Sequence, residues 1–272
     1  MKNIILSLIT VIGFISCEEN ISNSPTAGNY NPQEFSKSEE ANKIAEEVNS
    51  IITKDYEEDS SSKTMSTEPY LPNCVTRTYT TDGTTHSVEF DFGTTACTMP
   101  NGNAITGKIL YTYIGDLSSN TKTITYTLID FTFNDKEVDG SDIIDHIRSN
   151  TNGNPQSTIH VDFTITWPDG LIGERTGTIV REWIEGHDSL LDWSDDVFLV
   201  SGDWSTTFDN GNTYSANITT NLRRELTCWY FVSGTIDFNY NGLLFTGDYG
   251  NGTCDNDATL TFSNGTVVNI EL

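Results

Sequence analysis

Basic residues are scarce in this sequence. Its 272 residues include 14 Lys and Arg against 39 Asp and Glu, which gives a formal net charge of −25 at pH 7. A field of that sign repels phosphate backbones, so the composition argues against nucleic acid as a partner. It is compatible with basic protein partners, with divalent cations or with simple solubility.

Familiar catalytic and metal-binding motifs are also missing. The sequence contains no G-x-S-x-G, no H-E-x-x-H, no G-x-x-x-x-G-K-[ST] and no C-x-x-C. These absences argue against a serine-hydrolase elbow, a zinc protease, a phosphate-binding loop and a structural zinc site. We therefore predict no catalytic residues, and a binding or structural role is favoured over an enzymatic one.

No apolar run has the length of a membrane-spanning helix. The run from Ile4 to Ile15 would form only about 18 Å of helix, whereas a bilayer core is about 30 Å thick. It follows Lys2 and ends at Ser16 and Cys17. A positive residue, a short apolar run and a small residue are typical of a secretory signal peptide.

The end of this run carries a resemblance to known proteins. Phe14-Ile15-Ser16-Cys17 resembles the lipobox of bacterial lipoproteins, with Phe14 in place of the usual Leu or Val. The resemblance implies that residues 1–16 are a lipoprotein signal peptide and that acylated Cys17 attaches the chain to the membrane. Glu18-Glu19 resembles the export signal of Bacteroidetes surface lipoproteins. It implies a lipid-anchored protein on the cell surface of a bacterial outer membrane.

Residues 17–70 are predicted to be a lipidated acidic tether, disordered or helical, because their composition buries little apolar surface. Within them, apolar residues recur at helical spacing between Ser38 and Lys54. This pattern predicts one amphipathic helix. The helix could lie on the protein body or stay in solvent, and the charged background favours a spacer.

Residues 71–272 are predicted to form an all-β domain. Between Thr158 and Trp167, apolar side chains alternate with polar ones, which is typical of a half-buried antiparallel strand. About eleven such segments alternate with turn signals such as Asp209-Asn210-Gly211. We expect an antiparallel meander that forms a sandwich or a long curved sheet, with one weak helix candidate at Ser141–Arg148.

Four cysteines follow Cys17, and an even number in an exported chain suggests disulfides with three possible connectivities. They are Cys74, Cys97, Cys228 and Cys254. Cys97 and Cys254 each end the same pattern of Asp, aromatic, Gly, three residues and Cys, at the end of an expected hairpin. The spacing favours Cys74–Cys97 and Cys228–Cys254, and cross-pairing between the two ends of the domain remains the alternative.

The C-terminal pattern carries a second resemblance. The run GDYGNGTCDNDA at 247–258, followed by a short Asn-Gly hairpin, is similar to the C-terminus of a group of uncharacterised surface lipoproteins of the Bacteroidetes. The segments 194–202 and 226–235 are similar to others in that group. The resemblance implies location and fold, and it brings no activity with it.

Ligand-binding candidates come from aromatic and acidic residues. Trp193 lies in a polar acidic segment, where an exposed indole can stack on a glycan or anchor an envelope protein. No cofactor is predicted, but oxygen ligands for a possible calcium ion occur in two segments, with Asp188, Asp192, Asp195 and Asp196 in one and Asp255 and Asp257 in the other.

An alternative function is that of an envelope hydrolase that acts on polysaccharide. Glu174, Glu182 and Glu185 lie near Trp183 in the sequence, and glycoside hydrolysis uses paired carboxyl groups. In a chain with 39 acidic residues such proximity is expected by chance, so the binding or structural role is preferred.

Overall fold

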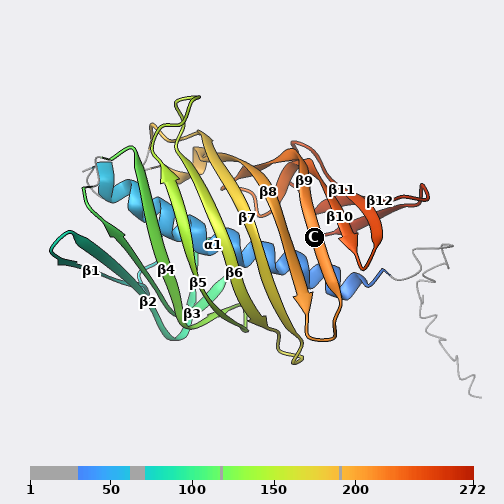
Figure 1. Ribbon diagram of the computed structural model, residues 1–272, viewed down its shortest axis with the longest axis horizontal. Helices are drawn as coiled ribbons and strands as arrows, with labels where there is room; N and C mark the ends of the chain where they lie inside the picture. Colours follow the sequence, from blue (N-terminus) through green and yellow to red (C-terminus); the bar gives the residue numbers. More distant parts are fainter. Residues whose placement is uncertain (1–29, 62–70, 117–118, 190–191) are drawn as a thin grey trace, which may run out of the picture.

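The computed structural model describes residues 30–61, 71–116, 119–189 and 192–272. The expected signal peptide, Cys17 and the Glu18-Glu19 pair lie outside these ranges. The described residues form one helix, one short 3-10 helix and a single antiparallel sheet of thirteen strands (Figure 1).

The strands follow one another in the sheet in their order along the chain. The elements are α1 (Pro32–Ser61), β1 (Thr76–Asp82), β2 (Thr85–Thr98), β3 (Ala104–Ile114), β4 (Thr121–Phe133), β5 (Lys136–Ile147), β6 (Gln156–Thr166), β7 (Ile172–Glu185), η1 (Trp193–Asp195), β8 (Val197–Phe208), β9 (Thr213–Glu225), β10 (Phe231–Tyr240), β11 (Leu243–Asn251), β12 (Asp257–Phe262) and β13 (Val267–Glu271).

The predicted all-β meander is confirmed, and the curved sheet is the correct one of its two forms. A sandwich is wrong because all thirteen strands belong to one sheet. Our count of about eleven strands was too low. The helix expected at Ser141–Arg148 is also wrong, because this segment belongs to β5 and pairs with β4 and β6 on either side. Its inward side chains, Asp142, Ile144 and His146, alternate with exposed ones, which is the period of a strand.

The alternation predicted in β6 is confirmed and shows how the sheet is filled. Ile159, Val161, Phe163 and Ile165 are all buried, and the residues between them face outward. A similar pattern in most of the other strands, though not in β1 or β13, gives the sheet one apolar concave face. That face needs a partner that covers it, because an antiparallel sheet buries one side against other elements.

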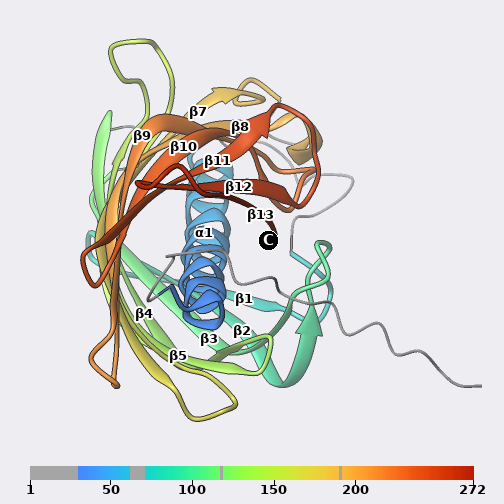
Figure 2. The same cartoon turned by 90° about the vertical axis from the view of Figure 1, so that its right-hand side faces the viewer.

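The partner is α1, which is longer than predicted and is not a spacer. Figure 2 looks along this helix and shows the sheet curving around it. Phe35, Ile44, Val48, Ile51 and Ile52 are at most 4% exposed. Burial of each such side chain stabilises the fold by about 1.5–3 kcal/mol, so the helix is part of the core. Within the described ranges, no helix is both long and apolar enough to cross a membrane.

Candidate functional site

Two hairpins carry the repeated cysteine pattern, and the structure gives both the same local geometry. In β2, the Asp91 carboxylate accepts a hydrogen bond from the Gly93 amide at 2.8 Å; in β11, Asp248 accepts from Gly250 at 2.9 Å. Both glycines have positive φ, 78° and 91°, a conformation that favours glycine. The aromatic residue between the Asp and the Gly of each pattern, Phe92 in β2 and Tyr249 in β11, is buried in the core.

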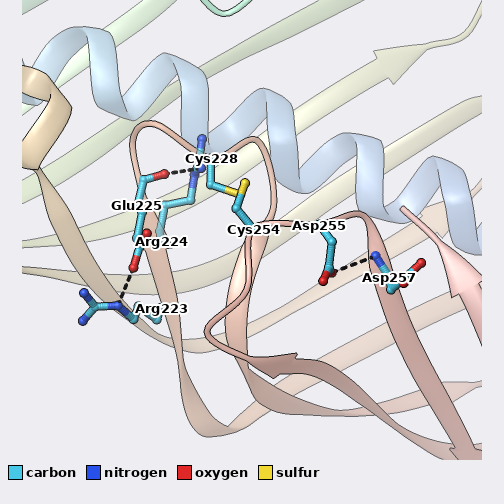
Figure 3. Close-up of a disulfide and its surroundings, with 7 residues drawn as sticks. All are labelled: Arg223, Arg224, Glu225, Cys228, Cys254, Asp255 and Asp257. Carbon is cyan, nitrogen blue, oxygen red and sulfur yellow. Dashed lines mark hydrogen bonds and ion pairs between the residues drawn. A yellow bond between two sulfur atoms is a disulfide. The ribbon is translucent and has the colours of Figure 1, made fainter.

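The predicted disulfide pairing is confirmed. Cys74 and Cys97 have their Cα atoms 5.8 Å apart and close the open end of the β1–β2 hairpin. Cys228 and Cys254, 5.7 Å apart, close the open end of β10–β11 (Figure 3). Because all four sulfurs form disulfides, none is left as a thiolate for zinc.

The segments beside the two disulfides form the walls of one cleft. We call residues 98–103, which follow Cys97, the first wall, and residues 226–231, which surround Cys228, the second wall. Pro100, Asn101 and Asn103 of the first wall and all six residues of the second wall line a cavity of about 190 Å³. The ring of Trp229 reaches across towards Gly102 of the first wall.

The floor of the cleft is one polar stripe of α1. Residues three or four apart lie on the same side of a helix, and the stripe consists of Glu39, Asn42, Lys43, Glu46, Glu47 and Ser50. The opposite side of the helix holds the apolar residues that pack on the sheet. One side of α1 is therefore part of the core, and the other side forms the floor of the cleft.

The carboxylates of the floor already have partners within the protein. Glu39 accepts hydrogen bonds from the Tyr249 hydroxyl at 2.8 Å and from Asn42 at 3.0 Å. Glu47 accepts one from Asn101 at 2.7 Å, which ties the helix to the first wall. Glu46 lies 3.2 Å from the Arg181 Nε atom. Burial raises the pKa of Glu39, and the hydrogen bond from Tyr249 partly opposes this shift.

Aromatic residues supply half of the second wall and one further side of the cleft. Trp193, the predicted ligand-binding residue, is half-buried and lines the cavity from η1. Trp229, Tyr230 and Phe231 line it from the second wall. Trp229 lies in the turn before β10 and is 40% exposed. An indole in such a position presents a face for stacking.

The calcium candidates lie apart from the cleft floor, and several of them have partners. The Asp196 carboxylate is buried and lies 2.8 Å from the Lys54 Nζ atom. Burial raises the pKa of Asp196 to about 6, although Lys54 opposes this shift. Asp192 accepts from Ser194, Asp195 from Ser189 and Asp255 from the Asp257 amide (Figure 3). Asp188 is exposed beside His187. Among the described residues, no three His, Cys, Asp or Glu side chains lie together so that they could hold a metal ion.

The carboxylates proposed for a hydrolase do not converge. Glu174 and Glu182 are eight residues apart on β7, a separation of about 26 Å along a strand, far more than paired catalytic carboxyl groups require. Asn150, Asn152 and Asn154 each donate to Glu182, and these hydrogen bonds lower its pKa. Glu185 pairs with Arg223 at 2.9 Å.

Sequence reasoning found Trp193 but missed Lys43, Asn101, Arg224 and Trp229, which also line the cleft. The polar stripe of α1 was visible as helical periodicity. The exposed turn around Trp229 carried no signal because its residues are those of a buried strand.

The fold and the cleft define a class: a helix held in a curved antiparallel sheet, with a mixed aromatic and charged cleft between two disulfide-bonded hairpins. Comparison with protein-family models, curated proteins and solved structures finds no match to this chain. The function is therefore argued from the cleft itself.

Proposed function

We propose that this chain is a lipid-anchored binding protein of the bacterial cell envelope and that the cleft between its two walls holds a glycan. One observation carries the proposal: a single cavity is lined both by exposed and half-exposed aromatic rings, Trp229 and Trp193, and by amide and charged side chains. Ligand sites combine apolar surface with a few placed polar groups in this way.

A glycan fits the cleft better than an extended peptide. Extended peptides are commonly bound by adding a strand to a sheet edge, where backbone groups pair. Here the floor is a helix, whose backbone groups are paired within the helix. Recognition in the cleft therefore depends on side chains, such as Asn42 and Lys43 of the floor and Asn101 of the first wall. Sugar hydroxyls suit amide and carboxylate groups, and sugar rings stack on indole faces.

The test is retention of the full chain on a panel of immobilised polysaccharides, with released reducing ends measured in the same samples. We expect retention by at least one polysaccharide, without release. Trp193→Ala and Trp229→Ala should each weaken binding about tenfold, equivalent to ~1.4 kcal/mol. Tyr79→Ala is the matched control, because Tyr79 is an exposed aromatic residue on β1, which does not line the cavity.

Retention that both tryptophan variants leave unchanged would place the ligand elsewhere, and no retention by any polysaccharide would remove glycans as the ligand class. Release of reducing ends would instead revive the hydrolase alternative.

The lipid anchor and the surface location belong to the same proposal, and they rest on the lipobox-like sequence at Cys17 and on Glu18-Glu19. We expect cells to incorporate labelled fatty acid into the wild-type chain and not into Cys17→Ser. Protease added to intact cells should digest the protein. Protection from the protease in intact cells, with digestion after lysis, would instead place it on the periplasmic side.

A further inference from the structure

The cleft brings a cluster of three basic side chains together among carboxylates of α1. Lys43 and Arg224 line the cavity of about 190 Å³. Lys43 also lines an adjoining groove of about 350 Å³, together with Lys136. Arg224 comes from β9, Lys136 from β5 and Lys43 from α1, so three elements far apart in the sequence bring their cations to one place.

Among the described residues, no carboxylate forms an ion pair with Lys43. Within the described part of the chain, none of the ion pairs or hydrogen bonds involves its ammonium group; its closest recorded partner is the Tyr230 ring, 5.2 Å from Nζ to the centroid. Lys136, by contrast, lies 3.5 Å from Glu40. The ammonium of Lys43 is thus half-buried, against an aromatic face and beside the cavity.

The acidic neighbours do not cancel this cation through direct contact. Glu39 is engaged by Tyr249 and Asn42, and Glu40 accepts from Trp167 Nε1 at 2.7 Å. Burial lowers the pKa of Lys43, the charges of Glu39 and Glu40 raise it, and those of Lys136 and Arg224 lower it further. Glu46 and Glu47 line the same cavity, but Glu46 pairs with Arg181 and Glu47 accepts from Asn101, so a ligand carboxylate can still pair with Lys43.

The aromatic platforms beside this cluster point to the kind of anion. Trp229 and Tyr230 line both the cavity and the adjoining groove, so they flank Lys43 on the side of the second wall. A sugar ring stacked on these residues would carry a ring substituent to the cations. A carboxylate on that ring would accept hydrogen bonds from an ammonium or a guanidinium group.

We propose that the ligand is an acidic saccharide, a chain of uronic-acid type, whose carboxylates bind Lys43, Lys136 and Arg224 while its rings stack on Trp229 and Tyr230. This inference rests on the proposed function, because it specifies the charge of the glycan in the same cleft. The protein is thereby a strongly acidic molecule that selects an acidic ligand. Selection of this ligand depends on the position of Lys43, because the carboxylates around it are engaged by other groups of the protein.

The test measures binding of the full chain to polygalacturonate, alginate and hyaluronate, each beside its carboxyl-reduced, neutral form. We expect at least one acidic form to bind about tenfold or more tightly than its neutral counterpart, with a preference that falls as salt rises. Lys43→Gln removes one charge at a helix position that tolerates glutamine, and it should weaken binding of the acidic form about tenfold and leave the neutral form nearly unchanged.

Lys108→Gln is the matched control. It removes the same charge from β3, where Lys108 pairs with Glu89 and Asp91 away from the cleft, and it should not change the preference. Thermal unfolding of both variants should stay within a few degrees of wild type.

Three outcomes would overturn the inference. Equal binding of acidic and neutral forms that still depends on Trp229 would leave the proposed function standing and remove the acidic class. A loss in Lys108→Gln as large as in Lys43→Gln would show a general charge effect. Stronger binding of oligo-glutamate than of any uronate would assign the cations to an acidic peptide.

Discussion

The two walls of the cleft share one framework and differ in what they present. Each adjoins a hairpin whose open end carries a disulfide and whose Asp-aromatic-Gly segment forms a bulge, an irregularity in the strand register. The first wall presents Pro100, Asn101 and Asn103, whereas the second wall presents Trp229, Tyr230 and Phe231. The shared features thus close the two hairpins, and the segments beside them decide the chemistry of the cleft.

The buried aromatic residue of the bulge shows the same division. Phe92 packs against Phe131 in an apolar setting, whereas Tyr249 packs against Phe231 and donates its hydroxyl to Glu39 of the helix. The Phe92 side chain of the β1–β2 hairpin therefore makes only apolar contacts in the core. The Tyr249 side chain of the β10–β11 hairpin adds a hydrogen bond to the floor of the cleft. If the cleft binds a ligand as we propose, this difference assigns the larger part of the binding to the second wall.

Removal of the disulfides should separate stability from binding most clearly. The two pairs close loops of similar length, with sequence separations of 23 and 26, so the chain-entropy model gives each about 3–4 kcal/mol of stability. We expect Cys74→Ser/Cys97→Ser and Cys228→Ser/Cys254→Ser to lose similar free energies of unfolding in urea. Ligand affinity should fall at least tenfold in the second variant and only about twofold in the first. Equal losses of affinity would contradict the assignment of the aromatic wall.

Exchange of the two bulge aromatics gives a smaller effect. Tyr249→Phe leaves the buried Glu39 carboxylate without its 2.8 Å donor, and we expect it to cost about 1–3 kcal/mol in the free energy of unfolding. Phe92→Tyr inserts a hydroxyl into a side-chain position that is 1% exposed, at a similar cost of about 1–3 kcal/mol. Only Tyr249→Phe should also change ligand affinity, since only Tyr249 lines the cleft. Chemical unfolding and a binding titration on each variant check both points.

The bulge glycines should give the smallest and most equal effects. A Cβ atom at Gly93 or Gly250 would meet its nearest neighbours at 4.0 and 3.8 Å, so space is available at both positions. Positive φ alone then sets the cost, about 1–2 kcal/mol for Gly93→Ala and for Gly250→Ala. Thermal unfolding should show matched shifts. A large shift in only one variant would mean that the two bulges are not equivalent.

Local patterns predicted much of this molecule because they act over short distances. The alternation at 158–167 identified the buried face of β6, and the repeated Asp-aromatic-Gly spacing identified both disulfides. The place of α1 could not be predicted in this way. Its charged stripe is typical of a solvated helix. The structure shows that this stripe lines the cleft between the two disulfide-bonded hairpins, which is why a helix with charged residues can lie inside a curved sheet.

Tertiary context also decided which aromatic residues the cleft would expose. Trp183 lies in a charged segment of the sequence and Trp229 in an aromatic and apolar one, yet Trp183 is 5% exposed and Trp229 is 40% exposed. Trp183 lies within β7, and Trp229 lies in a turn held by Cys228. The pattern of neighbouring residues does not predict this difference in exposure. The disulfide at Cys228, which holds Trp229 in a turn outside the strand, explains it.

Hydrogen exchange of the full chain, with and without the polysaccharide that it retains, tests the central claim most directly because no substitution is needed. The account predicts new protection in residues 98–103 and 226–231 and little change in the β1–β2 turn or in the outer strands β12 and β13. Protection that leaves both walls unchanged and appears at a sheet edge would contradict the cleft as the binding site.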